Sequence, residues 1–281
     1  MEISIFAPAK VNLHLTVLGR RADGYHELAT VMQPLDLGDD LVVGDQGPGL
    51  ELTCDDPALA GAGNLAYRAA RAWFAAAGRQ PVGRVHLTKR TPVAAGLGGG
   101  SSDAAAVLLA LNALHGRVLA PERLVELAAG LGADVAFFLG GETAWCAGVG
   151  ERVTPWPEFP LLDYVLVNPG FAVSTAWAFQ QMDLTWTKPG GRNKMKCPSG
   201  STLSPGWLLT NDLEAVTLTA HPELAEIKTA LRGAGAWGTL MSGSGPTVFG
   251  LFGDPEEARR AADRLTNRSG WWVRACRGYR A

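Results

Sequence analysis

A glycine-rich loop in the middle of the chain carries residues suited to binding phosphate. Three consecutive glycines, Gly98 to Gly100, let backbone N–H groups approach an anion that side chains would otherwise shield. A helix that we expect to begin at Ser102 or Asp103 adds its free N–H groups and the positive end of its dipole. The predicted nucleotide-binding loop comprises Pro92, Val93, Ala94, Ala95, Gly96, Leu97, Gly98, Gly99, Gly100, Ser101 and Ser102.

This loop matches neither of the two common phosphate-binding patterns. No glycine is followed by lysine, as GxxxxGK[ST] requires, and Ser101 stands where GxGxxG needs its third glycine. Glycine runs are also typical of a tight strand-to-helix turn with serine caps, and that alternative stays open. The order of a strand ending near Lys89, then the loop, then a helix favours the phosphate site.

Lys10 and Asp134 have side chains that suit phosphoryl transfer. This chemistry needs a base or orienting group at the attacking hydroxyl and a cation near the transferred phosphoryl group. Asp134 could be the base, and Lys10 could stabilise the alkoxide and the phosphoryl oxygens. Each also has a structural alternative, because Lys10 could be a solvated surface lysine and Asp134, after a Gly-Ala turn, could cap the element that follows.

Residue alternation places Lys10 in a strand. Between Ala9 and Val17, apolar residues occupy one face, and Lys10, Asn12, His14 and Thr16 occupy the other. Asn12 and His14 could therefore line the same site as Lys10, although paired surface polar residues would fit the pattern too. Further along, we predict helices at residues 65–77, 103–115 and 121–131 and strands near 85–87, 143–147 and 152–154.

A proline-rich stretch, Pro155 to Pro160, is the best candidate for a domain boundary. We therefore predict domains at residues 1–157 and 158–281. The second domain reads as an α+β layer, with helices on one face of a largely antiparallel sheet. Its predicted strands are 164–168, 237–241, 247–252 and 271–276, its predicted helices are 222–231 and 254–267, and residues 188–206 are expected to form a long loop.

The composition excludes several classes of function. At 281 residues and a net charge of −2, the chain has no general attraction to polyanions, so nucleic acid is not expected as a partner. The cysteines form no CxxC pair and the histidines no HExxH spacing, so neither a disulfide framework nor a structural zinc site is predicted. The sequence shows no secretory leader and no run of about 18 apolar residues, so we expect a cytoplasmic protein without a membrane segment.

Three motifs together resemble a known kinase superfamily. The nucleotide-binding loop in its context, Lys89 to Ala106, resembles the second motif of the galactokinase, homoserine kinase, mevalonate kinase and phosphomevalonate kinase superfamily. Ala7 to Leu13 resembles its N-terminal motif, and Met241 to Phe249 resembles its C-terminal glycine motif. The resemblance implies a two-domain α+β kinase with a mixed α/β N-terminal domain and a ferredoxin-like C-terminal domain. It also implies ATP and Mg²⁺ as cofactors, with Lys10 and Asp134 as the catalytic pair.

Two more segments narrow the resemblance to one branch. Arg21 to Leu28 and Gly132 to Val135 resemble the superfamily members that phosphorylate cytidine diphosphate methylerythritol in the non-mevalonate route to isoprenoid precursors. This implies transfer of the γ-phosphate of ATP to the 2-hydroxyl of the methylerythritol unit. The substrate-binding residues that the resemblance implies are Asn12, Tyr25, His26, Phe179, Ser244 and Gly245.

The resemblance suggests a role for most of these residues. It places Tyr25 and His26 at the cytidine, with an aromatic ring from the region of Phe179 on the second face of the base. Trp177 is the alternative to Phe179, and core packing would explain either. Ser244 and Gly245 could border the phosphates or form only a hairpin turn, and the two are compatible. The segment from Asn211 to Glu214 also resembles a family segment, but we interpret it mainly as a helix start.

Alternative functions remain at this point. Another kinase of the superfamily, acting on homoserine or a mevalonate derivative, would have no use for the segment from Asp23 to Glu27, which a nucleobase substrate explains. A non-catalytic nucleotide-binding protein would be expected to lack Lys10 or Asp134, and both are present. The ligands of Mg²⁺ are unassigned, and the choice between a monomer and a homodimer is open.

Overall fold

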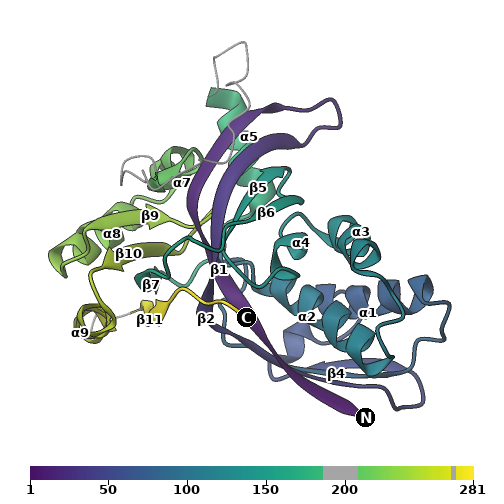
Figure 1. Ribbon diagram of the computed structural model, residues 1–281. Helices are drawn as coiled ribbons and strands as arrows, with labels where there is room; N and C mark the ends of the chain where they lie inside the picture. Colours follow the sequence, from purple (N-terminus) through teal and green to yellow (C-terminus); the bar gives the residue numbers. More distant parts are fainter. Residues whose placement is uncertain (186–207, 267–269) are drawn as a thin grey trace. The chain divides into compact units, whose positions relative to one another are not determined.

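Two long strands open the chain. β1 (Glu2–Arg20) and β2 (His26–Gly44) are hydrogen-bonded neighbours. The computed structural model describes residues 1–185, 208–266 and 270–281 (Figure 1). The long loop predicted for residues 188–206 lies outside the described residues.

Packing divides the chain into two compact units. Unit 1 comprises Met1–Ala9, Leu37–Thr91 and Gly98–Gly141, and unit 2 comprises Lys10–Asp36, Pro92–Leu97 and Glu142–Ala281. Neither unit is one continuous stretch, because β1 and β2 each contribute one end to each unit. The predicted domain boundary between residues 157 and 158 stays a prediction.

Unit 1 combines helices with a small sheet. In the sheet, β4 (Gly83–Thr88) pairs antiparallel with residues 40–44 of β2 and parallel with β3 (Leu50–Cys54). α1 begins where Asn64 Oδ1 accepts the Ala66 N–H at 2.8 Å, which confirms the predicted cap. The helices of this unit are α1 (Leu65–Ala76), α2 (Gly99–Leu114), α3 (Pro121–Leu131) and α4 (Val135–Phe138), with a 3-10 turn at Pro57–Leu59.

Unit 2 contains an antiparallel sheet with the strand order β11-β7-β10-β9. Its strands are β7 (Asp163–Asn168), β9 (Gly238–Met241), β10 (Val248–Phe252) and β11 (Trp272–Arg277). With helices after β7 and after β10, the chain follows the β-α-β-β-α-β pattern of ferredoxin-like folds. The predicted antiparallel sheet and ferredoxin-like class are confirmed.

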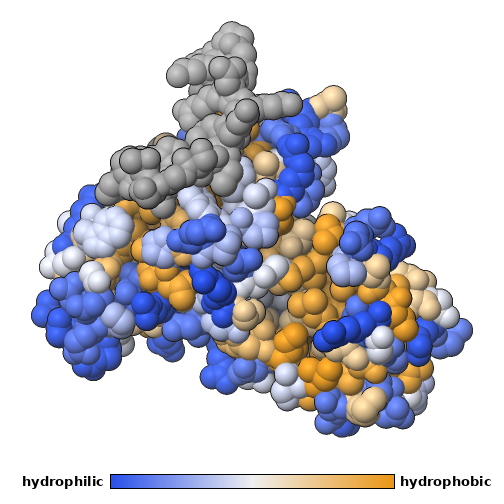
Figure 2. Space-filling model, viewed as in Figure 1, coloured by the Kyte–Doolittle hydropathy of each residue, from blue (hydrophilic) through white to orange (hydrophobic). Residues whose placement is uncertain are grey.

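The helices α8 (Glu223–Gly233) and α9 (Pro255–Thr266) cover one face of this sheet. Both contribute to a single buried apolar cluster that includes Val165, Val167 and Val248 of the strands. Because alternate residues of a strand point to the same face, the two helices share that face, as predicted. The outward side of α9 is exposed and charged, and it lies in the blue region at the lower left of Figure 2.

The remaining elements of unit 2 surround the second half of β1 and the first half of β2. β5 (Ala144–Gly148) pairs with residues 28–32 of β2 and with β6 (Arg152–Pro155). β8 (Thr210–Asn211) pairs in parallel with β1 at His14 and Leu15. The helices α5 (Thr175–Thr185) and α7 (Glu214–Ala220) complete the unit in the described part of the chain. Every helix that the structure describes is too short or too polar to span a lipid bilayer.

The polar face of β1 is buried, so a solvated surface position for Lys10 is wrong. Lys10, Asn12 and His14 are each 3% exposed. The cause is coverage by distant segments, since the Lys10 backbone N–H donates to Leu97 O at 2.9 Å and Trp145 stacks on His14 with ring centroids 6.2 Å apart. The strands β2 and β3 and the helix α5 had no counterpart among the predicted elements.

Gln33 of β2 ties that strand to the segment around β7. Its Nε2 donates to Thr143 Oγ1 at 2.7 Å and to Pro160 O at 2.9 Å. Its Oε1 accepts the Tyr164 hydroxyl at 2.7 Å and the Leu162 N–H at 3.2 Å. Gln33 is fully buried, so both polar atoms of its side chain are satisfied by protein groups.

Replacing Gln33 by leucine should lower the free energy of unfolding by about 1–3 kcal/mol, because the buried partners lose their hydrogen bonds. Urea denaturation followed by circular dichroism measures the change. Gln46→Leu, at an exposed glutamine, is the matched control and should leave the midpoint within experimental error. Equal destabilisation by the two substitutions would contradict a structural role for the Gln33 network.

Candidate functional site

The nucleotide-binding loop is shared between the units. Pro92–Leu97 belongs to unit 2, whereas Gly98 and the residues after it belong to unit 1. The helix α2 begins at Gly99 rather than at Ser102 or Asp103, so the predicted helix start is wrong. Gly98 precedes the helix in the left-handed conformation, with φ 71°, where a glycine is favoured because it has no Cβ.

The first turn of α2 is open to an anion. The backbone N–H groups of Gly99, Gly100 and Ser101 have no partner within the helix, because they precede its first hydrogen-bonded turn. A Cβ added to Gly100 would meet no atom within 4 Å, so this side of the turn is bare. Ser102 Oγ is buried and has no hydrogen-bond partner in the described structure. These features suit a phosphate group at the positive end of the helix.

Gly96 has no room for a side chain. A Cβ at this position would lie 2.1 Å from Ser242 O, and its φ of 76° is left-handed. The Gly96 carbonyl accepts two hydrogen bonds, from Lys10 Nζ at 3.1 Å and from Ser242 Oγ at 2.9 Å. The close approach of Gly96 and Ser242 therefore brings the nucleotide-binding loop and the C-terminal glycine motif together within unit 2.

Lys10 is held by two oxygens of unit 2. Its Nζ donates to Asn12 Oδ1 at 2.5 Å and to the carbonyl of Gly96 at 3.1 Å. The short contact with Asn12 confirms that the two side chains share a face of β1, as the alternation predicted. An ammonium group that is nearly excluded from water interacts strongly with any negative charge placed beside it.

Ser242 and Thr30 complete this arrangement, although neither was predicted from the sequence to belong to the site. Ser242 Oγ accepts the Asn12 backbone N–H at 3.2 Å. Asn12 Nδ2 donates to Thr30 Oγ1 at 2.9 Å, which in turn donates to His14 O at 2.6 Å. Ser242 stood inside a recognised glycine motif and could have been chosen, whereas no local pattern marked Thr30.

Asp134 lies at the start of α4 in unit 1. It occupies the N-cap position, but its side chain makes no capping hydrogen bond, which weakens the purely structural alternative. Gly132 precedes it closely, and a Cβ on Gly132 would lie 3.9 Å from Ser101 Oγ. The turn that carries Asp134 is therefore adjacent to the first turn of α2.

The residues predicted to bind a cytosine base lie in unit 2. The rings of His26 and Phe179 stack with centroids 4.7 Å apart at an interplanar angle of 14°. Tyr25 is 64% exposed at the turn between β1 and β2. Trp177 contacts His221 instead, with centroids 6.0 Å apart. Phe179 is thus the aromatic side chain beside His26, and its contact with a base stays a prediction.

Ser244 and Gly245 lie in the turn between β9 and β10. The Ser242 N–H donates to Thr247 O at 2.9 Å and the Gly245 N–H donates to Ser242 O at 2.9 Å, so the segment is a hairpin turn. Ser244 is buried, its Oγ lies 3.0 Å from Thr175 Oγ1, and its carbonyl accepts Thr217 Oγ1 at 3.3 Å. The turn interpretation is confirmed, and a substrate role for this pair stays a prediction.

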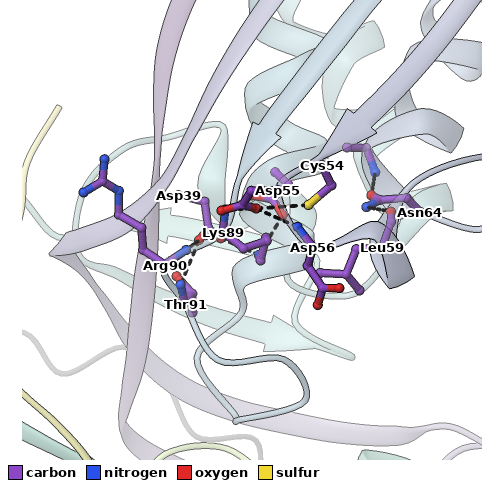
Figure 3. A network of polar contacts seen from close by, with 11 residues as sticks. Asp39, Cys54, Asp55, Asp56, Leu59, Asn64, Lys89, Arg90 and Thr91 are labelled. Atoms are coloured by element: carbon purple, nitrogen blue, oxygen red, sulfur yellow. Dashed lines mark hydrogen bonds and ion pairs between the residues drawn. The ribbon is translucent and has the colours of Figure 1, made fainter.

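A buried ion-pair group lies next to α2 in unit 1. Lys89 Nζ is 2.5 Å from Asp39 Oδ2 and 3.0 Å from Asp103 Oδ2. Figure 3 shows Asp39 beside the backbone of Arg90 and Thr91, whose N–H groups donate to Asp39 Oδ1 at 2.6 and 2.8 Å. Through these contacts β2, the end of β4 and the helix α2 are joined at the point where the nucleotide-binding loop begins.

Asp103 is only partly compensated within this group, because its Oδ2 pairs with Lys89 but its other oxygen does not. Its Oδ1 is buried without a hydrogen-bond partner in the described structure. Burial raises the pKa of Asp103 to about 7, and the neighbouring Lys89 ammonium opposes that rise only in part. Asp39 acts in the same direction as burial, because its negative charge disfavours a second carboxylate nearby.

The stability of Asp103→Asn relative to the wild type should be higher at pH 8 than at pH 5. The folded pKa is raised above the unfolded value of about 3.9, so wild-type stability falls as pH rises from about 4 to about 7. The stability difference between variant and wild type should grow by on the order of 2 kcal/mol between these two pH values. Urea denaturation of both proteins at each pH measures it, and a difference independent of pH would refute the raised pKa.

The described residues fit a nucleotide-bound magnesium ion better than a protein-held metal. No group of three or more His, Cys, Asp or Glu side chains in the described part of the chain could hold a metal ion. Mg²⁺ in nucleotide sites takes most of its ligands from phosphate and water, so the protein needs to supply only one or two oxygens. The partnerless Ser102 Oγ is suited to such a position.

Comparisons with known families and proteins agree with this geometry. The family model described as "GHMP kinases N terminal domain" matches residues 64–142, and the model described as "GHMP kinases C terminal" matches residues 201–270. A 4-diphosphocytidyl-2-C-methyl-D-erythritol kinase of Geobacter metallireducens is 47% identical over 278 residues, covering 98% of each chain. The protein of the same name from Syntrophotalea carbinolica is 47% identical and covers 95% of this chain and 96% of its own length.

Solved structures give the same result. A crystal structure of 4-(cytidine 5'-diphospho)-2C-methyl-D-erythritol kinase matches with a TM-score of 0.81 and 41% identity, covering 98% of this chain and 99% of its own. A homoserine kinase from Cytophaga hutchinsonii matches with a TM-score of 0.72, covering 99% and 95% of the two chains. Its identity of 20% supports a common fold only.

Proposed function

We propose that this chain transfers the γ-phosphate of ATP to the 2-hydroxyl of 4-diphosphocytidyl-2-C-methyl-D-erythritol. The chain belongs to the GHMP kinase family and, within it, to the 4-diphosphocytidyl-2-C-methyl-D-erythritol kinases. The observation that carries the proposal is the buried Lys10 ammonium, held by Asn12 and by the carbonyl of Gly96 in the nucleotide-binding loop. That arrangement joins a cation for phosphoryl transfer to the motif that binds the phosphates.

ATP binds through the first turn of α2 in this proposal. The N–H groups of Gly99, Gly100 and Ser101 and the positive helix end hold the phosphates. Mg²⁺, when bound with the nucleotide, neutralises phosphate charge, and Ser102 Oγ is the oxygen that unit 1 offers it. Lys89 lies against this turn, since a Cβ on Gly99 would be 3.2 Å from Lys89 Nζ. The ion pairs of Lys89 therefore help to hold the turn in place.

Lys10 stabilises the negative charge that develops during transfer. Its hydrogen bonds to Asn12 and Gly96 fix the ammonium before the substrate arrives, so little reorganisation is required at the moment of reaction. The oxygens of Asn12 and Gly96 are neutral, so these two bonds orient the ammonium without adding a negative charge of their own. Stabilisation of the alkoxide and of the phosphoryl oxygens by the same ammonium favours the transition state over the ground state.

Asp134 accepts the proton of the 2-hydroxyl, or orients that hydroxyl for attack. Its place supports this role, because the turn from Gly132 to Asp134 lies beside Ser101 in the first turn of α2, which would hold the phosphates. Absence of a capping bond from its side chain is consistent with a role outside helix α4. A carboxylate that acts as a general base at the attacking hydroxyl typically raises the reaction rate by about 10²- to 10⁴-fold.

The cytidine is recognised by Tyr25, His26 and Phe179 in this proposal. Tyr25 presents an exposed ring that can stack on a base. His26 covers one face of the Phe179 ring, which is partly buried against the apolar core of unit 2, so a base would contact the part of the ring that stays exposed. Asn12, Ser244 and Gly245 are assigned to the methylerythritol and diphosphate parts. A cytoplasmic location, and a monomeric or homodimeric state, stay predictions.

Substrate choice is tested by ADP release measured with three acceptors, namely 4-diphosphocytidyl-2-C-methyl-D-erythritol, mevalonate and homoserine. We expect turnover with the cytidine compound and at least about 100-fold less with the other two, because they lack the base that the aromatic residues recognise. Tyr25→Ala should raise KM for the cytidine compound, while Tyr67→Ala, at a tyrosine of α1, is the control. Turnover restricted to mevalonate or homoserine would overturn the proposed substrate.

The mechanism is tested by Asp134→Asn. We expect kcat to fall by about 10²- to 10⁴-fold, because asparagine cannot accept the hydroxyl proton. Calorimetric titration with ATP should give a dissociation constant close to that of the wild type, because the phosphates are held by α2. Glu142→Gln, a comparable neutral replacement outside the site, is the matched control. An unchanged kcat in Asp134→Asn would remove Asp134 from the role of base.

A further inference from the structure

The segment Asn211-Asp212-Leu213-Glu214, which we call the NDLE segment, does more than start a helix. The helix α7 begins at Glu214, and Leu213 at its N-cap position provides no side-chain cap. Asn211 Oδ1 accepts the Leu213 N–H at 2.9 Å, a local contact typical of a turn. The other polar contacts of the segment reach residues far away in the sequence, so the helix start does not explain them.

Asn211 clamps the turn that contains Ser242. Its Nδ2 donates to Met241 O at 2.8 Å and to Gly243 O at 2.7 Å. The amide orientation follows from chemistry, because a flipped side chain would place its oxygen against two carbonyl oxygens. Asn211 is buried, so its two N–H donors and its oxygen are all used within the protein.

Lys10 and Asn12 lie against the clamped turn. A Cβ on Gly243 would be 3.5 Å from Lys10 Nζ and 3.3 Å from Asn12 Oδ1. Between the two clamped carbonyls, Ser242 Oγ accepts the Asn12 N–H and donates to Gly96 O, the carbonyl that also holds Lys10. A shift of this turn would therefore displace the oxygens of Asn12 and Gly96 that accept hydrogen bonds from the Lys10 ammonium.

The other residues of the NDLE segment anchor the same frame. Glu214 Oε1 accepts the Met241 N–H at 2.9 Å and pairs with Lys228 Nζ at 2.6 Å. Asp212 Oδ2 accepts the Val17 N–H of β1 at 2.9 Å, and the Asp212 N–H donates to Leu15 O at 3.0 Å. The segment thus holds β1, which carries Lys10, and the Ser242 turn with one short stretch of backbone.

We infer that Asn211 is a positioning residue for phosphoryl transfer, which sets the place of the Lys10 ammonium by clamping the carbonyls on either side of Ser242. The inference rests on the proposed function, in which Lys10 stabilises the transferred phosphoryl group. Asn211 itself does not touch the reacting atoms, and its effect passes through Ser242, Gly96 and Asn12.

Asn211→Ala should lower kcat for the cytidine substrate about 10- to 100-fold, because a displacement on the order of 1 Å at a reacting group has effects of that size. KM for ATP should change less than about threefold, since α2 holds the phosphates. Gln33→Leu, which removes another buried amide of unit 2 away from the Ser242 turn, is the matched control and should lower stability while keeping kcat near that of the wild type. Both variants are assayed well below their unfolding midpoints.

A double-mutant cycle identifies the route. Ser242→Ala removes the hydroxyl that joins Asn12 to Gly96. If Asn211 acts through Ser242, the double variant should lose less kcat than the product of the two single effects. Independent, multiplicative losses, or an Asn211→Ala variant with wild-type kcat, would overturn the inference. If Asn211→Ala does not fold, Asn211→Ser, which keeps one hydroxyl donor, takes its place in the cycle.

Hydrogen exchange separates this inference from the proposed function. Backbone amides of residues 242–245 should exchange faster in Asn211→Ala than in the wild type, with no such change in Gln33→Leu, whether or not a substrate is turned over. Unchanged exchange there would overturn the clamp even if the enzyme is active. If the amides of residues 242–245 exchange faster in Asn211→Ala as expected but the wild-type protein has no kinase activity, the proposed function alone is refuted.

Discussion

The burial of the Lys10 ammonium is the constraint on which the rest of the site depends. A charged group with 3% of its surface exposed is costly unless it is hydrogen-bonded. Two of its acceptors are Asn12 Oδ1, in β1 itself, and the carbonyl of Gly96 in the nucleotide-binding loop. That carbonyl can reach Lys10 only because Gly96 has no side chain, since a Cβ there would overlap Ser242 O. The glycine motifs therefore serve the lysine as well as the phosphate.

Local patterns predicted the parts of the fold that local physics decides. The Asn64 cap and the Pro121 start placed α1 and α3 correctly, because caps and prolines act on neighbouring backbone groups. The alternation of β1 correctly placed Lys10 and Asn12 on one face. It did not predict that this face is buried, because its partners lie up to 230 residues away in the chain. β2 was missed for a related reason, since a run buried on both faces shows no alternation.

The start of α2 shows where propensity fails at a functional position. Serine and aspartate are good N-caps and glycine is a poor helix former, so Ser102 or Asp103 was the reasonable predicted start. The helix instead begins at Gly99. A glycine in a helix costs conformational entropy, but here it leaves the start of the first turn without a side chain. Such a departure is expected where binding needs bare backbone, and it favours a phosphate site over a simple turn.

Lys10 and Lys89 are both largely shielded from solvent, but the acceptors that hold them differ. Lys89 lies between Asp39 and Asp103, whose carboxylates balance its charge, so it fixes β2, β4 and α2 to one another. Among the acceptors of Lys10 are an amide oxygen and a backbone carbonyl, which orient the ammonium without adding a negative charge of their own. Neutral acceptors hold less strongly than carboxylates. The positions of Asn12 and Gly96 must therefore be fixed by further contacts. Within unit 2, the hydrogen bonds of Asn211 to the Ser242 turn contribute to this.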